Sequence, residues 1–171
     1  MKKIIISLLG LGLASFAYAG TSSATFDITG TLASSCTTSF VDGSSTLSAL
    51  VAGSQSTGTN TYSINCTPGI STLAISATST NSWRLISAMT TPAATYIAYT
   101  LAPTSAPPTG FASTWSGTAG SATPVDIVTT ATQPVFAGSA VTIPVTVTTE
   151  AVPAASNAGT YSDTVTLATS F

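Results

Sequence analysis

Residues 21–32 read TSSATFDITGTL, and apolar side chains alternate along them with small or polar ones. Ala24, Phe26, Ile28 and Leu32 all occupy even positions, which is the period of a strand with one apolar face. The polar run that follows offers no hairpin partner nearby. We therefore predict a strand that pairs with another molecule; the alternative is that residues 21–33 pair within their own domain.

The chain begins with the features of an export signal. Two lysines precede an apolar run over residues 4–16, and Ala17-Tyr18-Ala19 has the small-x-small pattern of a signal-peptidase site. This predicts a secretory signal peptide over residues 1–19. The alternative is an N-terminal membrane anchor, for which the apolar run is short. Removing 19 of the 171 residues leaves 152, a length that suits one domain.

Charge is sparse in the predicted mature chain. Lys2 and Lys3 leave with the signal peptide, so Arg84 faces five carboxylates and the net charge is −4. A nucleic-acid-binding protein needs several basic side chains to displace counterions from phosphates. The composition therefore excludes nucleic acid as a partner.

Valine, isoleucine and threonine are abundant, and they favour the pleated surface of a sheet. Turn signals separate short alternating runs, which predicts an all-β protein with a β-sandwich architecture. Pro144 falls inside the strongest run and suggests an edge strand or a bulge. The predicted strands cover residues 47–51, 61–66, 70–77, 83–89, 96–101, 140–152 and 160–171, with shorter pieces at 111–115, 125–128 and 134–136.

Cys36 and Cys66 are the two cysteines of this exported chain, so a disulfide between them is expected. Closing a loop of that length stabilises a fold by about 3–4 kcal/mol in the chain-entropy account. Two thiols without any histidine do not make a metal site.

Catalytic groups are scarce. The chain has no histidine and its five carboxylates are scattered, so nucleophilic triads are impossible and no acid–base pair is indicated. We predict that the protein is not an enzyme and needs no cofactor or metal. Trp83, Trp115 and Phe111 could form a sugar-binding platform, although aromatic side chains more commonly pack in a core.

Several segments together resemble the subunits of archaic chaperone–usher pili, the spore coat protein U domain family. They are the alternating N-terminal strand leading into Cys36, the second cysteine at a strand end, the segment YIAYTL at 96–101 and the ending GTYSDTVTLATSF from Gly159. The ending is the most specific of them. The very low charge and the proline-rich insert after Leu101 depart from the family pattern.

The resemblance implies an immunoglobulin-like β-sandwich that lacks its last strand and is completed by a donor strand from another subunit. In the family, a periplasmic chaperone first lends a strand, and the N-terminal segment of the next subunit replaces it at the outer-membrane usher. Such head-to-tail strand addition does not close and therefore gives a filament. The expected location is a fimbrium on the surface of a Gram-negative bacterium, with roles in adhesion and biofilm formation.

The resemblance also assigns roles along this chain. Residues 20–33 become the donor segment, which can overlap the first strand, and residues 34–171 become the pilin domain. Ala24, Phe26, Ile28, Gly30 and Leu32 are the expected donor positions. The expected C-terminal strand and chaperone-docking residues are Tyr161, Val165, Leu167 and Phe171. The alternative function is a self-complemented secreted coat protein or a tip adhesin that binds a surface or glycan.

Overall fold

The computed structural model describes residues 28–87, 96–128 and 133–171. The chain divides into two compact units, Met1–Thr31 and Leu32–Phe171, and the fold below is that of the second unit. The predicted signal peptide and most of the donor segment lie outside the described residues. Within the described ranges the regular elements are all strands, and no helix is long and apolar enough to cross a membrane.

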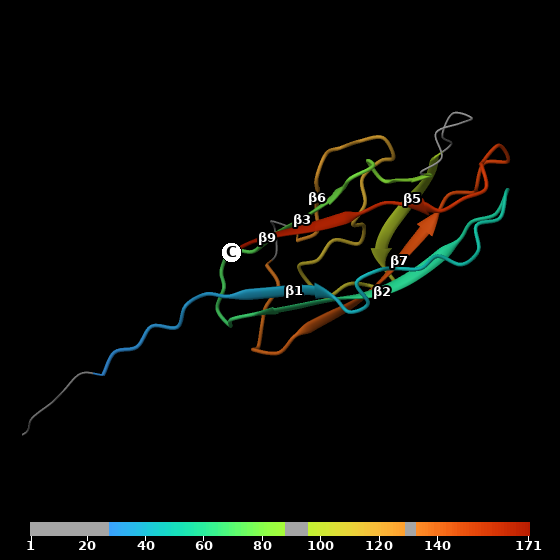
Figure 1. Ribbon diagram of the computed structural model, residues 1–171. Coiled ribbons are helices and arrows are strands. Elements are labelled where there is room, and N and C mark those ends of the chain that lie inside the picture. Colours follow the sequence, from blue (N-terminus) through green and yellow to red (C-terminus); the bar gives the residue numbers. More distant parts are fainter. Residues whose placement is uncertain (1–27, 88–95, 129–132) are drawn as a thin grey trace, which may run out of the picture. The chain divides into compact units, whose positions relative to one another are not determined.

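The described strands form two antiparallel sheets (Figure 1). The larger sheet has the order β1-β2-β7-β5-β4-β8 and the smaller has the order β6-β3-β9. The larger sheet contains β1 (Cys36–Phe40), β2 (Thr57–Cys66), β4 (Arg84–Ser87), β5 (Tyr96–Pro103), β7 (Val141–Thr149) and β8 (Tyr161–Ser162). The smaller sheet contains β3 (Ala74–Ser79), β6 (Val125–Asp126) and β9 (Val165–Ser170).

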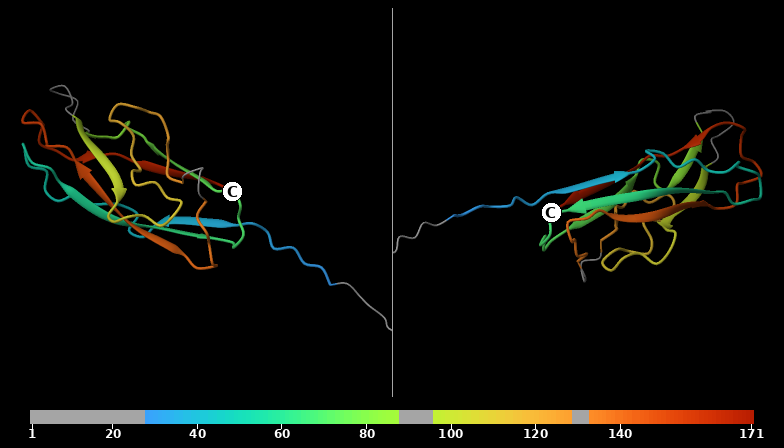
Figure 2. Two further views of the ribbon diagram at one scale, coloured as in Figure 1. Left: turned by 180° about the vertical axis from the view of Figure 1, so that it is seen from behind. Right: turned by 90° about the horizontal axis from the view of Figure 1, so that it is seen from below.

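The core lies between these two sheets, and two views of the ribbon show them as facing layers (Figure 2). Alternate side chains of β2, β7 and β3 point inward because successive residues of a strand face opposite sides of the sheet. The fully buried side chains include Tyr62, Ile75, Ile143 and Val145. Tyr62 meets the ring of Trp115 edge-on, with 5.4 Å between ring centroids. The protein is thus an all-β sandwich of the immunoglobulin-like kind, as the sequence predicts.

Four of the strand predictions were wrong in detail. Residues 111–115 form no strand, and Phe111 makes only an isolated bridge with Val128. Residues 47–51 form no strand, and Ala52 makes only an isolated bridge with Val152. The segment 134–136 has no regular structure, although Phe136 is buried. The single strand expected over 160–171 is split into β8 and β9, which belong to different sheets. The end of the predicted strand 83–89 lies outside the described residues.

Pro144 does not mark an edge or a bulge, so that expectation was also wrong. It lies in β7, which pairs with β2 on one side and β5 on the other, and it stands opposite Thr61 in the β2 register. Its carbonyl accepts the Thr104 N–H at 2.8 Å, on the β5 side. The nitrogen of a strand residue faces the same neighbour as its carbonyl. The position where Pro144 lacks an N–H therefore faces the residues just past Pro103, where β5 ends. The pairing of β7 with β2 is unaffected.

Candidate functional site

A groove of about 760 Å³ opens between the segment that follows β1 and the segment that leads into β9. Its floor consists of core side chains of the larger sheet: Leu85 from β4, Tyr99 and Leu101 from β5, and Val145 and Val147 from β7. Four of these side chains are buried and Val147 is half-buried. The floor of the groove is therefore apolar, and its walls carry small polar residues together with Leu47, Leu50, Tyr161 and Val165.

The first wall of the groove is formed by residues 43–50, which run along the edge of β2 without forming a regular strand. Ser48 N donates to Thr57 O at 3.1 Å, and just before the wall Val41 N donates to Thr61 O at 2.9 Å. Leu47 and Leu50 are half-buried and line the groove. In the described part of the chain, no strand pairs with the outer edge of β1 or of this wall.

The second wall runs from Gly159 through β8 to Val165 at the start of β9. β9 pairs with β3 on one side, and no described strand pairs with its other edge. Val165 and Leu167 have inward positions but are only half-buried, which is the pattern of a strand whose neighbour is absent. β9 runs opposite to β1, and its C-terminal end lies at the same end of the domain as the start of β1 (Figures 1 and 2). The unpaired edges of β8 and β9 thus lie on one side of the apolar floor, opposite the irregular wall of residues 43–50.

Asp163 stands at the bend between β8 and β9 and accepts four hydrogen bonds. Its Oδ2 accepts from Ser79 Oγ at 2.5 Å and from Tyr99 Oη at 2.6 Å. Its Oδ1 accepts from the backbone N–H groups of Asn81 at 2.9 Å and Thr164 at 2.7 Å. Burial, together with the hydrogen bond to the Asp163 carboxylate and its charge, raises the pKa of Tyr99. Tyr99 is therefore neutral and a hydrogen-bond donor at physiological pH.

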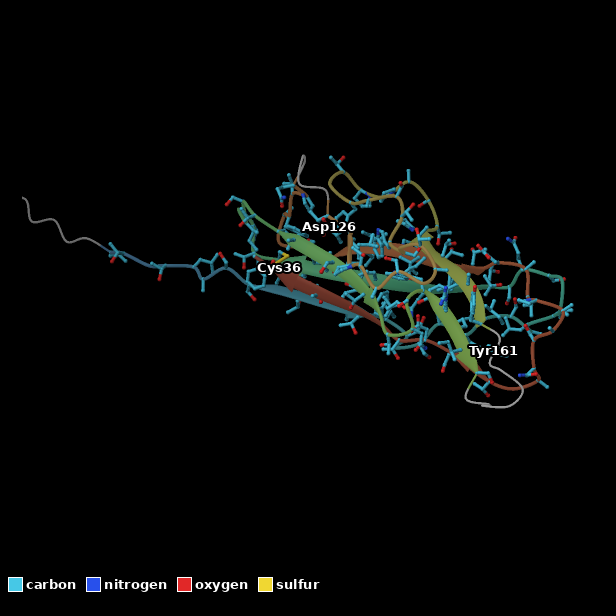
Figure 3. The ribbon with its side chains drawn as sticks, turned by 90° about the horizontal axis from the view of Figure 1, so that it is seen from above. Cys36, Asp126 and Tyr161 are labelled. Carbon is cyan, nitrogen blue, oxygen red and sulfur yellow. A yellow bond between two sulfur atoms is a disulfide. The ribbon has the colours of Figure 1, made fainter. Side chains whose placement is uncertain are left out.

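The expected disulfide joins Cys36 to Cys66 at the first register pair of β1 and β2. The pairing continues just outside the strand, where Thr67 N donates to Ser35 O at 2.9 Å and Ser35 N donates to Thr67 Oγ1 at 3.1 Å. The start of the domain is thereby fixed to β2 by covalent and hydrogen bonds. Cys36 and the groove-lining Tyr161 lie at opposite ends of the domain (Figure 3).

The predicted donor positions are only partly described. Ala24 and Phe26 lie outside the described residues. Ile28, Gly30 and Leu32 are not in a strand and are exposed, Ile28 by 83% and Leu32 by 82%. Their role as a donor strand stays a prediction.

The predicted C-terminal residues occupy the second wall and the end of the chain. Tyr161 is in β8 and donates its hydroxyl to Asn157 O at 3.0 Å, while Val165 and Leu167 are in β9. Phe171 follows β9 and is 52% exposed. The groove thus brings Tyr161 and Val165 together with the core, and Phe171 remains accessible beyond the strand.

The three aromatic residues pack in the core, the more common of the two arrangements that the sequence allowed, and they form no sugar-binding platform. Trp83 and Trp115 are fully buried, and Phe111 is 6% exposed. Trp115 Nε1 donates to Ala112 O at 2.9 Å, so its one polar atom is satisfied inside the fold. These three side chains contribute to the core and present no flat surface to a sugar.

The described residues contain no group of three or more histidine, cysteine or carboxylate side chains that could hold a metal ion. The described carboxylates are Asp42, Asp126, Glu150 and Asp163, and Asp163 is occupied by the four donors above. What the site offers is a surface for another polypeptide: hydrogen-bonding strand edges and an apolar floor.

The family model of the Spore Coat Protein U domain matches residues 21–168. The chain belongs to this family. Spore Coat Protein U domains are subunits of archaic chaperone–usher pili, so the protein is a pilus-type structural subunit of a family associated with the Gram-negative cell surface. The match spans the first predicted donor residues and ends within β9. Among curated proteins and among solved structures, no match to this chain was found.

The sequence of this Spore Coat Protein U domain did not indicate that most of the groove-lining residues belong to one site. The wall at residues 43–50 was expected to be loops around a short strand, and its apolar members Leu47 and Leu50 were the only signal in it. The floor residues were assigned to strands, but their meeting in one groove floor depends on packing that no local pattern encodes. Asp163 was part of the GTYSDTV motif, without a role.

Proposed function

We propose that the protein polymerises by donor-strand exchange, with residues 20–33 of one subunit filling the groove of another. The observation that carries this proposal is the groove itself, which has an apolar floor and lies beside the unpaired edges of β8 and β9. An added strand gains backbone hydrogen bonds at such edges and buries alternate side chains in the floor. The match to a family of pilus subunits supports the same assignment.

The alternation in residues 21–32 fits the proposed occupant. Ala24, Phe26 and Ile28 project from one face of an extended segment, and a groove with an apolar floor accepts one such face. Burying a side chain of the size of Phe26 or Ile28 contributes about 1.5–3 kcal/mol. The intervening residues, among them Thr25 and Thr29, face solvent on this proposal and contribute little.

A periplasmic chaperone occupies the groove first on this proposal, because the unpaired strand edges beside the groove favour aggregation. Basic chaperone residues bind the carboxylate of Phe171, which is accessible at the end of β9. The next subunit then replaces the chaperone strand at the outer-membrane usher. The resulting filament serves surface attachment and biofilm formation.

The test compares inward and outward positions of the donor segment. The full chain is exported with its chaperone and usher, and oligomers are resolved on non-boiled gels and by electron microscopy. Ile28→Asp places a charge in the apolar groove, so we expect the ladder of oligomers and the filaments to be lost. Thr29→Asp, the matched control one residue along, leaves both intact.

A deletion of residues 21–29 completes the experiment. We expect this variant to remain a chaperone-bound monomer, because its groove is present and its donor strand is not. A wild-type chain that stays monomeric without any chaperone contradicts the proposal and indicates the self-complemented coat protein, in which the segment fills the groove of its own domain. Equal ladders from Ile28→Asp and Thr29→Asp would contradict the assigned register.

A further inference from the structure

The two segments that cross between the sheets lie side by side at one edge of the sandwich. β3 belongs to the smaller sheet and β4 to the larger, so the chain crosses between them at residues 80–83. β8 and β9 make the reverse crossing at Asp163 and Thr164. The crossings are paired, because Ser79 is in register with Val165 and Ile86 with Ser162. A two-stranded ribbon therefore bends from one sheet into the other at this corner.

The corner is held by side chains more than by regular pairing. Asn81 Nδ2 donates to Ser162 O at 3.1 Å, and Thr80 N donates to Thr164 O at 2.9 Å. Ser82 and Trp83 have φ values of 55° and 62°, a left-handed conformation that is unfavourable for residues other than glycine. Two successive residues in that conformation require surrounding contacts that hold them.

The Asp163 carboxylate supplies those contacts. It binds the crossing of β3–β4 through Asn81 N and Ser79 Oγ, and Ser79 Oγ in turn accepts the Trp83 N–H at 2.5 Å. It binds the floor of the groove through Tyr99 Oη at 2.6 Å. All these partners are neutral donors, and a carboxylate with four of them is well satisfied although it is half-buried.

We propose that Asp163 is a positioning residue for strand capture: its carboxylate holds the corner where β8 passes into β9 and so fixes the groove wall that receives the incoming strand. The wall runs from Gly159 to Val165, and Asp163 is the member of it that is bonded both to the floor and to the opposite crossing. If the wall moves away from the floor, the incoming strand loses its hydrogen-bonding edge. This inference rests on the proposed donor-strand function.

The experiment measures how long assembled ladders survive. Full-chain oligomers of each variant are purified, and their dissociation half-life is followed on non-boiled gels at one elevated temperature. Asp163→Asn keeps an oxygen for the two backbone donors but replaces Oδ2, the acceptor of Ser79 and Tyr99. We expect dissociation about tenfold faster, the effect of losing one charge-assisted hydrogen bond. Tyr99→Phe removes one of these bonds and shifts the half-life in the same direction by less.

The matched control is Asp126→Asn, an exposed carboxylate on β6, at the other edge of the smaller sheet from β9. It removes the same charge and leaves the half-life unchanged. Hydrogen exchange of the assembled oligomers separates positioning from general stability. Amides of residues 160–170 exchange faster in Asp163→Asn, while those of β2 and β7 stay protected over the same period.

The outcomes distinguish this inference from the function on which it rests. Wild-type chains that form no ladder overturn both. Wild-type and Asp163→Asn ladders of equal half-life overturn the positioning role and leave donor-strand exchange standing. Loss of protection throughout β2 and β7 also overturns it, because Asp163 would then stabilise the whole fold. If Asp163→Asn fails to fold, Tyr99→Phe decides: an unchanged half-life overturns the proposal, and a shorter one supports it.

Discussion

Tyr62 carries a buried hydroxyl that makes no hydrogen bond of good geometry, and the polar groups closest to it are the side chains of Thr38 and Thr169. Its ring fills the core between Phe40 and Trp115, with ring centroids 5.6 Å and 5.4 Å away. A buried hydroxyl without a well-aligned partner costs free energy, whereas the ring gains it by burial. The side chain is therefore retained by its ring, and the hydroxyl contributes little to stability.

Tyr62→Phe is expected to change the free energy of unfolding by no more than about 0.5 kcal/mol at neutral pH, because only poorly aligned contacts with Thr38 and Thr169 are lost. The two forms differ in alkali. Burial raises the pKa of Tyr62 from 10.0 to about 12. The unfolded chain therefore loses this proton first, and the stability of the wild type falls as the pH rises from 10 towards 12.

Chemical unfolding at pH 8, 10 and 11.5 tests this expectation on the exported protein. The wild type should lose more stability than Tyr62→Phe across that series. Tyr99 titrates in both proteins, so some loss remains in the variant. Identical pH dependence of the two proteins would show that Tyr62 does not titrate as its burial requires.

The elements show where sequence reasoning succeeded. The sequence analysis located β2, β3, β5 and β7 from their alternating residues. One face of each strand meets the core and the other does not, so apolar and polar side chains alternate along it. The run over 160–171 alternates equally well, yet it divides between two sheets at Asp163. Alternation reports which face is inward but not which sheet a residue joins. The bend depends on donors from Ser79 and Tyr99, which are distant in sequence.

The wall segment 43–50 illustrates the same limit and gives a prediction at the scale of elements. A side chain at Gly58 of β2 would place its Cβ 2.8 Å from both Ser45 Oγ and Thr46 O. Gly58→Ala should therefore force the wall away from β2 and lower the free energy of unfolding by about 1–3 kcal/mol. Thr59→Ala, at the next and exposed position of the strand, should cost much less. Urea unfolding of the two variants provides the comparison; equal losses would contradict the close packing of the wall.

For the whole molecule, the composition and spacing were sufficient to predict an all-β sandwich with one disulfide, and the family pattern indicated a pilus subunit. The groove could not be predicted in this way, because its floor combines side chains from β4, β5 and β7 that meet only after the sheets pack. Trp83, Trp115 and Phe111 pack in the core, the more common arrangement for such side chains, but sequence alone does not distinguish a buried ring from an exposed one.

The disulfide gives a prediction for the whole domain. Replacing Cys36 and Cys66 together by alanine should lower the free energy of unfolding by about 2–5 kcal/mol, the usual effect of removing a native disulfide from a small exported domain. Oxidised and reduced wild-type protein should show the same difference, and thermal unfolding measures both. A double variant as stable as the oxidised protein would show that β1 is held adequately by its pairing with β2 alone.

That disulfide also decides how a filament assembled as proposed would carry tension. When the donor segment is pulled, the force acts on the first residue of β1, a strand of five residues at the edge of the sheet. Hydrogen bonds loaded one after another from such an end break at low force. The bond at Cys36 transfers the load at once to β2, which has ten residues and neighbours on both sides. Stretching single filaments with and without a reductant tests this transfer of load. Reduced filaments should lengthen at lower force, and equal forces for the two would exclude the transfer. Tension then bypasses β1.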